Sequence, residues 1–331
     1  MMRKNLAVFV ILAFALVLFL GSRQNAFADY PEKPITVYIS FPAGGSTDLA
    51  ARSLGPGLEK ALGQQVVFVN KPGGTGTVAF GILAGEKPDG YTLTVGVNSA
   101  IIWNPIVRKL PYKPLADFTP VICFGTAPTG VSVRSDAPYQ TWQEFVDYAR
   151  KNPGKIKYGT TGAVSIFTAG MKLASKELGL KMVHIPYKGS MPAYTALLGG
   201  HVEAAVSDSV FDEFVKAGKL TLIAAFTKER IPEYPNTPTL IELGVNLYNN
   251  VGEYSLFGPA GMDPAIVKKL EDAVISCYET EPFKMMAKSF MFETYEIRNK
   301  ELVSKFEQEW KQNEKLMIDL GMVEKTATPP K

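Results

Sequence analysis

The feature that most constrains the fold is a repeated order of apolar strand, glycine-containing turn and amphipathic helix. A strand pattern over residues 35–41 leads through the turn 42–45 into a helical pattern over 47–62. Further strand patterns follow over 65–70 and 92–97. Strands that alternate with helices are typical of parallel βαβ units whose two faces are both covered by helices.

The same order starts again after residue 135. The predicted elements of this second set are helices over 142–151 and 192–198, a helix after residue 165, and strands over 156–159, 182–185, 202–206 and 221–226. Two successive sets of βαβ units fit two α/β lobes better than one large sheet. The sequence therefore predicts two lobes.

Two apolar stretches rich in small residues, 121–133 and 254–257, have the character of strands that cross between the lobes. We therefore expect lobe I to comprise residues 29–127 and 256–331, and lobe II to comprise residues 128–255. Two crossing strands form a natural hinge around a central cleft.

The first 28 residues have the pattern of a secretory signal peptide. Arg3 and Lys4 precede an apolar run over 6–20, and the small residues Ala26 and Ala28 end the segment. This run is shorter than the roughly 20 residues that span a bilayer. We therefore expect cleavage after Ala28 and export to the periplasm, rather than a membrane anchor.

The charge of the chain gives no sign of a nucleic-acid partner. Without its first 28 residues the chain keeps 32 basic residues against 32 acidic ones, which is a net charge near zero. Binding of nucleic acid would need a clustered excess of Lys and Arg. We expect no such partner.

Four predicted strand ends carry small polar residues. Ligands of open α/β sheets bind beyond the carboxyl ends of the strands, so we expect these residues to meet in one cleft. At the first of them, glycines allow a sharp turn, and the following helix offers N–H groups and a dipole that favour an anion. The candidate ligand-binding residues are Gly44, Gly45, Ser46, Thr47, Asp48, Asn98, Ser99, Thr160, Thr161, Gly162, Ser165 and Asp208.

The chemistry of these four turns favours a carboxylate. None of them contains Lys or Arg, and recognition by backbone N–H groups and hydroxyls suits a carboxylate better than a multiply charged phosphate. Arg52 lies four residues after Asp48, where it is expected to pair with that acid. Asp208 could accept a hydrogen bond from an amino or hydroxyl group of the ligand, although a helix cap explains it as well.

An enzyme is the weaker interpretation. Residues 74–79 match the G-x-G-x-x-A pattern of nicotinamide-binding folds, but Asn98 stands where an acid is expected. There is no G-x-S-x-G motif, and neither His184 nor His201 has an evident Ser or Cys partner. We expect no catalytic residue and no cofactor.

The two cysteines leave alternatives open. Cys123 and Cys277 could pair in an oxidising compartment, or they could remain two separate buried thiols. The few His and Cys residues show no close spacing, so we expect no metal site.

Motifs along nearly all of the chain after residue 28 resemble those of the substrate-binding proteins of tripartite tricarboxylate transporters, the Bug family. Any one of them is weak, but their order and spacing together are specific. They include FPAGGSTD (41–48), NKPGG (70–74), KPDGYTL (87–93), PYKGS (186–190), LLGGHVE (197–203) and FGPAG (257–261).

The resemblance implies a periplasmic-binding-protein-like (Venus flytrap) fold. It has two α/β lobes, each a mostly parallel sheet flanked by helices, joined by two crossing strands. It also implies that backbone groups and ordered water capture a small carboxylate in the cleft. The partners would be the membrane subunits of a tripartite tricarboxylate transporter, and we expect a monomer. A receptor that presents its ligand to a membrane sensor is the alternative.

One loop departs from the family pattern. The family loop resembles G-S-S-G-x-G-S followed by a His-Leu pair, whereas residues 159–168 read GTTGAVSIFT. Val164 replaces a glycine and the histidine is absent. We expect Phe167 to narrow or reshape the pocket, so the identity of the ligand does not transfer from relatives.

Overall fold

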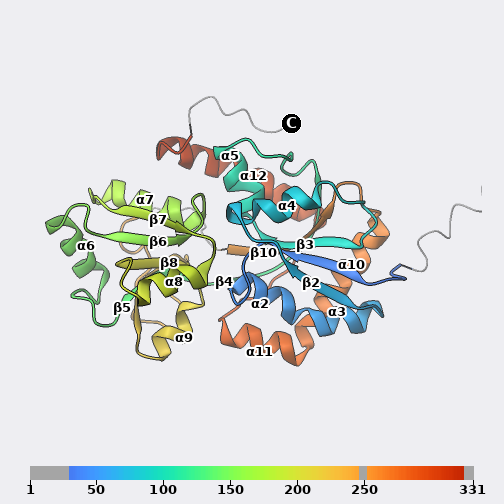
Figure 1. The fold of residues 1–331 in the computed structure, drawn as a ribbon, viewed down its shortest axis with the longest axis horizontal. Helices are drawn as coiled ribbons and strands as arrows, with labels where there is room; N and C mark the ends of the chain where they lie inside the picture. Colours follow the sequence, from blue (N-terminus) through green and yellow to red (C-terminus); the bar gives the residue numbers. More distant parts are fainter. Residues whose placement is uncertain (1–29, 246–251, 324–331) are drawn as a thin grey trace, which may run out of the picture.

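The computed structural model describes residues 30–245 and 252–323, which form two sheets flanked by helices (Figure 1). The strand order is β11-β4-β10-β3-β1-β2 in the first sheet and β7-β6-β8-β5-β9 in the second. The predicted signal peptide lies outside the described residues. Among the described residues, no helix is both long and apolar enough to cross a membrane.

The first sheet carries both the start and the end of the described chain. Its strands are β1 (Ile35–Ile39), β2 (Val66–Asn70), β3 (Thr92–Val97), β4 (Phe118–Ala127), β10 (Gly252–Pro259) and β11 (Ile297–Arg298). Its helices are α2 (Ser46–Ser53), α3 (Gly55–Leu62), α4 (Thr77–Leu83), α5 (Asn104–Val107), α10 (Pro264–Ser276), α11 (Glu281–Ser289) and α12 (Asn299–Asp319). The short turns η1 (Gly74–Gly76), η2 (Ser99–Trp103) and η3 (Cys277–Glu279) complete it.

The predicted helix over 47–62 is two helices. Helix α2 ends at Ser53 and α3 begins at Gly55, with Leu54 between them. Pro56 lies in the first turn of α3, where its missing N–H costs nothing, whereas inside a continuous helix it would remove a hydrogen bond.

The second sheet is built from the middle of the chain. Its strands are β5 (Thr129–Arg134), β6 (Lys157–Thr161), β7 (Val183–Tyr187), β8 (Ala204–Asp208) and β9 (Leu220–Ala225). Its helices are α6 (Trp142–Lys151), α7 (Ile166–Glu177), α8 (Ser190–Leu198) and α9 (Phe211–Lys216). The first of them, α6, starts with a capping box between Thr141 and Glu144.

The predicted two-lobed α/β architecture is confirmed, but both sheets are mixed. The βαβ half of each sheet is parallel, with β1 beside β2 and β3, and β6 beside β7 and β8. Strands β10 and β5 run antiparallel to both of their neighbours, and β11 runs antiparallel to β4. The prediction of mostly parallel sheets therefore holds only for the βαβ halves, because the strands that connect the lobes enter in the opposite direction.

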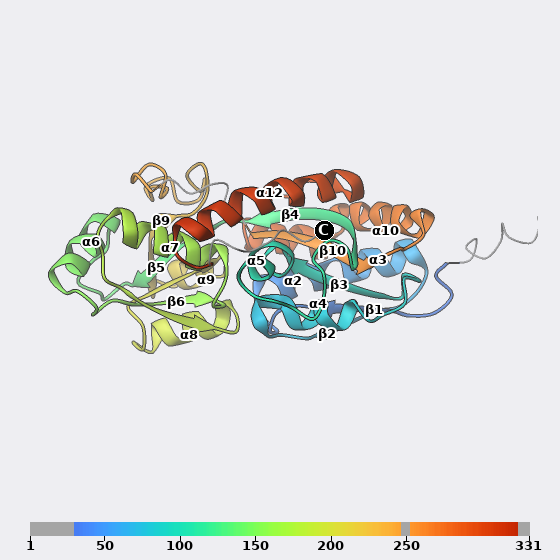
Figure 2. The same cartoon turned by 90° about the horizontal axis from the view of Figure 1, so that it is seen from above.

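The chain passes from the first sheet to the second within two residues. Strand β4 ends at Ala127 and β5 starts at Thr129, and the chain is back in the first sheet at Gly252. Helix α12 lies along the first lobe and extends toward α7 of the second (Figure 2). The Lys176 ammonium of α7 donates to the Asp319 carbonyl at 2.7 Å.

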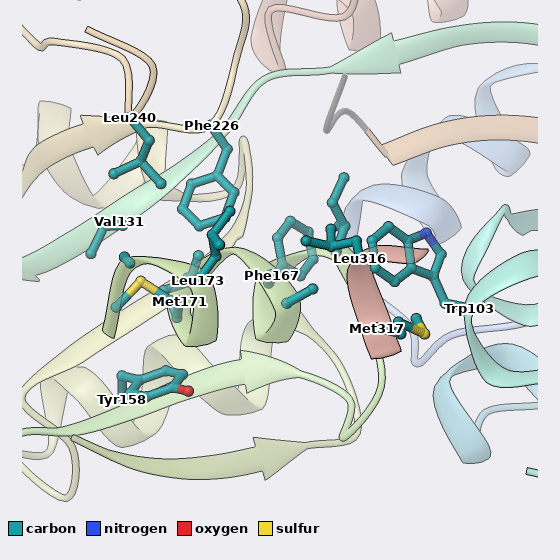
Figure 3. Close-up of a cluster of buried hydrophobic side chains, with 14 of the residues drawn as sticks. Trp103, Val131, Tyr158, Phe167, Met171, Leu173, Phe226, Leu240, Leu316 and Met317 are labelled. Carbon is teal, nitrogen blue, oxygen red and sulfur yellow. The ribbon is translucent and has the colours of Figure 1, made fainter. Parts of the chain in front are cut away.

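One hydrophobic cluster contains side chains from both lobes. Phe167 and Phe226 of the second lobe belong to it together with Trp103, Leu316 and Met317 of the first (Figure 3). Because a continuous apolar cluster excludes water from the lobe boundary, its burial stabilises the closed arrangement of the lobes.

Both cysteines are free and buried. The Cys277 thiol donates to the carbonyl of Leu54 at 3.3 Å and to that of Ala273 at 3.1 Å. Burial raises the pKa of each thiol to about 12. Of the two alternatives that the sequence left open, the structure has the separate buried thiols.

Candidate ligand-binding site

A cavity of about 40 Å³ lies between the two sheets, at the ends of their strands. It is lined from the first lobe by Phe41, Pro42, Ala43, Gly45, Ser46, Thr47, Thr75, Val97, Asn98, Ser99, Gly252 and Tyr254. From the second lobe it is lined by Thr129, Thr161, Ser165, Ile166, Phe167, Gly189, Ser190, Met191, Pro192 and Asp208. A single water molecule needs about 10–15 Å³ of such space, so the cavity between the closed lobes exceeds the room for one water.

Three helices point their N-termini at this cavity. They are α2 at Gly45, α7 at Ser165 and α8 at Gly189. The Ser165 hydroxyl caps α7, but neither α2 nor α8 has a side-chain cap. The first N–H groups of α2 and α8 therefore lack an intrahelical partner, and the helix dipole adds partial positive charge at the same place.

Within the part of the chain that the structure describes, the lining contains no Lys, Arg or His side chain, and Asp208 is its only acid. The remaining polar groups are hydroxyls and one amide. Such a wall binds an anion of low charge through backbone N–H groups and hydroxyls. It offers nothing that would neutralise a multiply charged phosphate.

Asp48 holds the first-lobe turn through hydrogen bonds and does not line the cavity. Its carboxylate accepts from the Gly44 N–H at 3.0 Å, from Arg52 Nε at 2.8 Å and from Asn70 Nδ2 at 2.8 Å. The predicted pairing of Asp48 with Arg52 is confirmed. Gly44 has φ +77°, a left-handed conformation that a residue with a Cβ rarely adopts.

A chain of hydroxyls joins the lobes at one end of the cavity. Tyr254 donates to the Ser46 hydroxyl at 2.8 Å, and Ser46 donates across the cleft to Asp208 Oδ2 at 2.6 Å. Ser190 donates to the same oxygen at 3.1 Å. Burial raises the pKa of Asp208, and these two hydroxyls counter that shift in part because they stabilise the ionised form.

The second-lobe loop places two of its predicted residues in the cavity and two beneath it. Thr161 and Ser165 line the cavity. Thr160 donates to the Gly162 carbonyl at 2.9 Å, and its hydroxyl lies 2.7 Å from His184 Nε2. Thr160 and Gly162 therefore hold the loop in shape, and neither lines the cavity.

The glycine-rich segment 74–76 forms part of the opposite wall. Thr75 lines the cavity with φ +59°, which is unusual for a β-branched residue. Its carbonyl accepts from the Ser99 hydroxyl at 3.1 Å. The G-x-G-x-x-A pattern here builds a turn against the next strand end. Among the described residues, no group of three or more His, Cys, Asp or Glu side chains could hold a metal.

Eight of the twelve candidate residues line the cavity, which are Gly45, Ser46, Thr47, Asn98, Ser99, Thr161, Ser165 and Asp208. Gly44, Asp48, Thr160 and Gly162 do not. Phe167, expected to narrow the pocket, does line it. Sequence reasoning missed Ser190, although Gly189-Ser190 follows the end of β7 and repeats the glycine-hydroxyl pattern of the other strand ends. It also missed Thr129 and Tyr254, which lie within strands and carry no turn signal.

Residues 50–322 match the family described as tripartite tricarboxylate transporter family receptor. A protein of Cupriavidus necator, the UPF0065 protein in gbd 5'region, is 34% identical over 88% of this chain and 89% of its own. The structure of an R. palustris protein with adipate has a TM-score of 0.83 at 27% identity, and covers 88% of this chain and 98% of its own. The periplasmic binding protein BugD has a TM-score of 0.80 at 27% identity, over 89% and 99%.

Proposed function

Because this chain belongs to the tripartite tricarboxylate transporter receptor family, we propose that it captures a small carboxylate-bearing solute between its lobes and delivers it to the membrane subunits of such a transporter. The family consists of periplasmic solute-binding receptors. One structural neighbour is described with adipate. We infer that a carboxylate is also what this cavity receives.

The observation that carries this proposal is the meeting of two uncapped helix N-termini in a cavity whose described lining has no basic side chain. Gly45, Ser46 and Thr47 at the start of α2 line it from one lobe, and Gly189 and Ser190 at the start of α8 line it from the other. A single carboxylate satisfies such donors and matches the partial charge of the two helix ends.

The proposed mechanism is capture followed by closure. The carboxylate docks on the N-terminus of α2 in the open state, and α8 then closes over it with the second lobe. Ligand shifts the population toward the closed state only through the contacts that it gains there. The bond from Ser46 to Asp208 is one contact that forms on closure without the ligand.

The remaining parts of the proposal concern export and assembly. Residues 1–28 would act as a cleaved signal peptide, and the mature protein would work as a monomer without a catalytic step. Lobe I would comprise residues 29–127 and 256–331, and lobe II residues 128–255. The crossing strand β10 (Gly252–Pro259) spans the second boundary, and its first residues already pair with the first sheet.

The test is calorimetric titration of residues 29–331 with linear carboxylates of increasing length, and with NAD as a separate arm. Thr47→Asp adds a negative charge at the N-terminus of α2, where an acid suits the dipole but repels an anionic ligand. Thr47→Asn has the same shape without the charge. We expect Thr47→Asp to weaken carboxylate binding about 100-fold relative to Thr47→Asn, which corresponds to two like charges in a site of low dielectric.

Equal affinity of Thr47→Asp and Thr47→Asn for the carboxylate would contradict its proposed position at the N-terminus of α2. Binding of NAD with no response to any carboxylate would overturn the receptor in favour of a nicotinamide enzyme. Circular dichroism and the melting temperature of both variants show whether a loss of binding reflects the site or the fold.

A further inference from the structure

Two side chains on the second-lobe wall of the cavity have polar atoms without a partner. Thr129 Oγ1 and Asp208 Oδ1 are buried and accept or donate no hydrogen bond within residues 30–245 and 252–323. The two residues are direct cross-strand partners in the antiparallel pair β5 and β8, so their side chains share one face of the sheet. Both line the cavity.

Asp208 shares with Glu271 the lack of a salt-bridge partner within residues 30–245 and 252–323, whereas three other buried acids have one. Asp48 pairs with Arg52, Asp212 pairs with Lys216, and Glu253 pairs with Lys305. Asp208 has only the hydroxyls of Ser46 and Ser190 on Oδ2. The N–H groups of Val210 and Asp208 lie close enough to favour the ionised form, but neither reaches Oδ1 with the geometry of a hydrogen bond.

A buried carboxylate without a cation is unfavourable, because the attraction of an opposite charge no longer offsets the loss of hydration. Burial accordingly raises the pKa of Asp208. A positively charged group at Oδ1 would restore the balance. Among the described residues no Lys, Arg or His lines the cavity, and the ends of α2 and α8 at Ser46 and Ser190 offer only partial positive charge to Oδ2. A full positive charge at Oδ1 would therefore come from the solute.

We propose that Thr129 and Asp208 form a subsite for the ammonium group of the solute, so that the bound molecule is an amino-bearing carboxylate. This inference rests on the proposed function, since it assumes that the carboxylate of the same molecule lies at the N-termini of α2 and α8. An ammonium has three N–H donors. One donates to Asp208 Oδ1 and one to Thr129 Oγ1.

The anionic and cationic ends of such a zwitterion would lie side by side. Asp208 Oδ2 accepts from Ser46 and Ser190, the first residues of α2 and α8, so an ammonium at Oδ1 lies next to a carboxylate at these helix ends. A solute without the ammonium would leave Oδ1 of Asp208 buried and unpartnered. Leaving a charged group without its partner costs more than the bond itself contributes, which makes the subsite selective.

The test compares matched pairs of solutes on the wild-type mature protein by calorimetric titration at pH 7. The pairs are succinate with aspartate, glutarate with glutamate, and propionate with alanine and β-alanine. At least one amino-bearing member should bind about tenfold or more tightly than its partner, since the difference is a charge-assisted hydrogen bond. Equal or tighter binding of the plain acids overturns the subsite and leaves the proposed function standing. Failure of every carboxylate to bind overturns both.

Asp208→Asn and Thr129→Val locate the effect. Asp208→Asn keeps the shape and an acceptor for Ser46, but removes the charge, so the preference for the amino-bearing member should fall to within about threefold. Thr129→Val removes only the hydroxyl and should lower the preference by a smaller factor. A tenfold preference that persists in Asp208→Asn overturns the assignment. The wild-type comparison needs no variant, so it decides the question even where Asp208→Asn fails to fold.

Discussion

His184 shows how burial sets the protonation of a single residue beneath the second-lobe loop. Its ring stacks on Tyr158 with centroids 5.1 Å apart, and Nε2 lies 2.7 Å from the Thr160 hydroxyl. Burial lowers the pKa of His184 from 6.5 to about 4, and the charge of Lys172 adds to this shift. The ring is therefore neutral in the folded protein at neutral pH, where Nε2–H can donate to Thr160.

This shift predicts a loss of stability in mild acid. In the unfolded chain His184 takes up a proton near pH 6.5, but in the folded protein it does so only near pH 4. Between these values the unfolded state binds more protons, so the free energy of unfolding falls as the pH falls. We expect His184 to account for about 1–2 kcal/mol of this fall, after allowance for its partial exposure.

The measurement is urea unfolding of the wild type and His184→Gln between pH 4 and 7. The difference in free energy of unfolding between the two proteins should change across this range in the direction given above. His201→Gln is the control, since His201 is exposed at a turn. A constant difference between wild type and His184→Gln would show that the ring titrates alike in both states.

At the scale of elements, α12 is tied to the crossing strand β10 by a buried ion-pair network. Lys305 of α12 lies 2.9 Å from Glu253 Oε1 of β10 and also pairs with Glu309, one turn further along α12. Tyr295 donates to Glu253 at 2.8 Å, and Asn98 Nδ2 donates to Glu309 at 3.4 Å. Burial raises the pKa of Glu309, and the nearby charge of Glu253 raises it further. The Lys305 ammonium acts in the opposite direction, because it offsets the repulsion between the two carboxylates.

Lys305→Met should therefore destabilise the protein by about 3 kcal/mol, because it leaves the buried Glu253 and the half-buried Glu309 without their shared cation. Thermal and urea unfolding at pH 7 measure this loss. Lys311→Met removes an exposed lysine from the same helix and should change the stability by no more than about 0.5 kcal/mol. Equal stabilities of the two variants would show that Lys305 contributes no more than a surface charge.

The element scale also shows which parts of the fold local sequence could predict. Helix α6 was predicted with its observed bounds, since its apolar periodicity and end signals are local. The mixed sheets were not, because β4 and β10 pair Ala127 with Gly252, and no local pattern records that contact. The same reason explains which site residues could be predicted. The turns at Gly45 and Ser165 carry a local sequence signal, whereas Thr129 reaches the cavity through its pairing with Asp208 on another strand.

At the scale of the whole molecule, the structure is a closed state in which the lobes share an apolar cluster and also meet at glycines close to the cavity. Gly189 of α8 meets Pro42 of the first lobe, and Gly162 meets Thr75. Asn104 Nδ2 donates to the Val164 carbonyl at 3.1 Å across the same boundary. Small residues at these points let the two walls approach closely enough for the starts of α2 and α8 to line one cavity.

Gly189→Ala should hold the lobes apart without disturbing either of them. A Cβ at Gly189 would lie 2.9 Å from Pro42 Cδ, which is closer than real Cβ contacts, and a tight 3.1 Å from Pro42 Cγ. The backbone at Gly189 has φ −174°, which any residue adopts, so the clash exists only when the lobes close. We expect solute affinity to fall about tenfold or more, because the binding-competent closed state becomes less populated. Small-angle scattering should show that saturating solute no longer compacts the variant as it compacts the wild type.

Gly85→Ala, whose added Cβ meets the Ile82 carbonyl at an ordinary 3.6 Å, is the control for a new methyl group. Wild-type affinity together with wild-type compaction in Gly189→Ala would mean that the ligand is held without the contact between α8 and the first-lobe turn, and that closure over the α2 terminus is not how this protein binds.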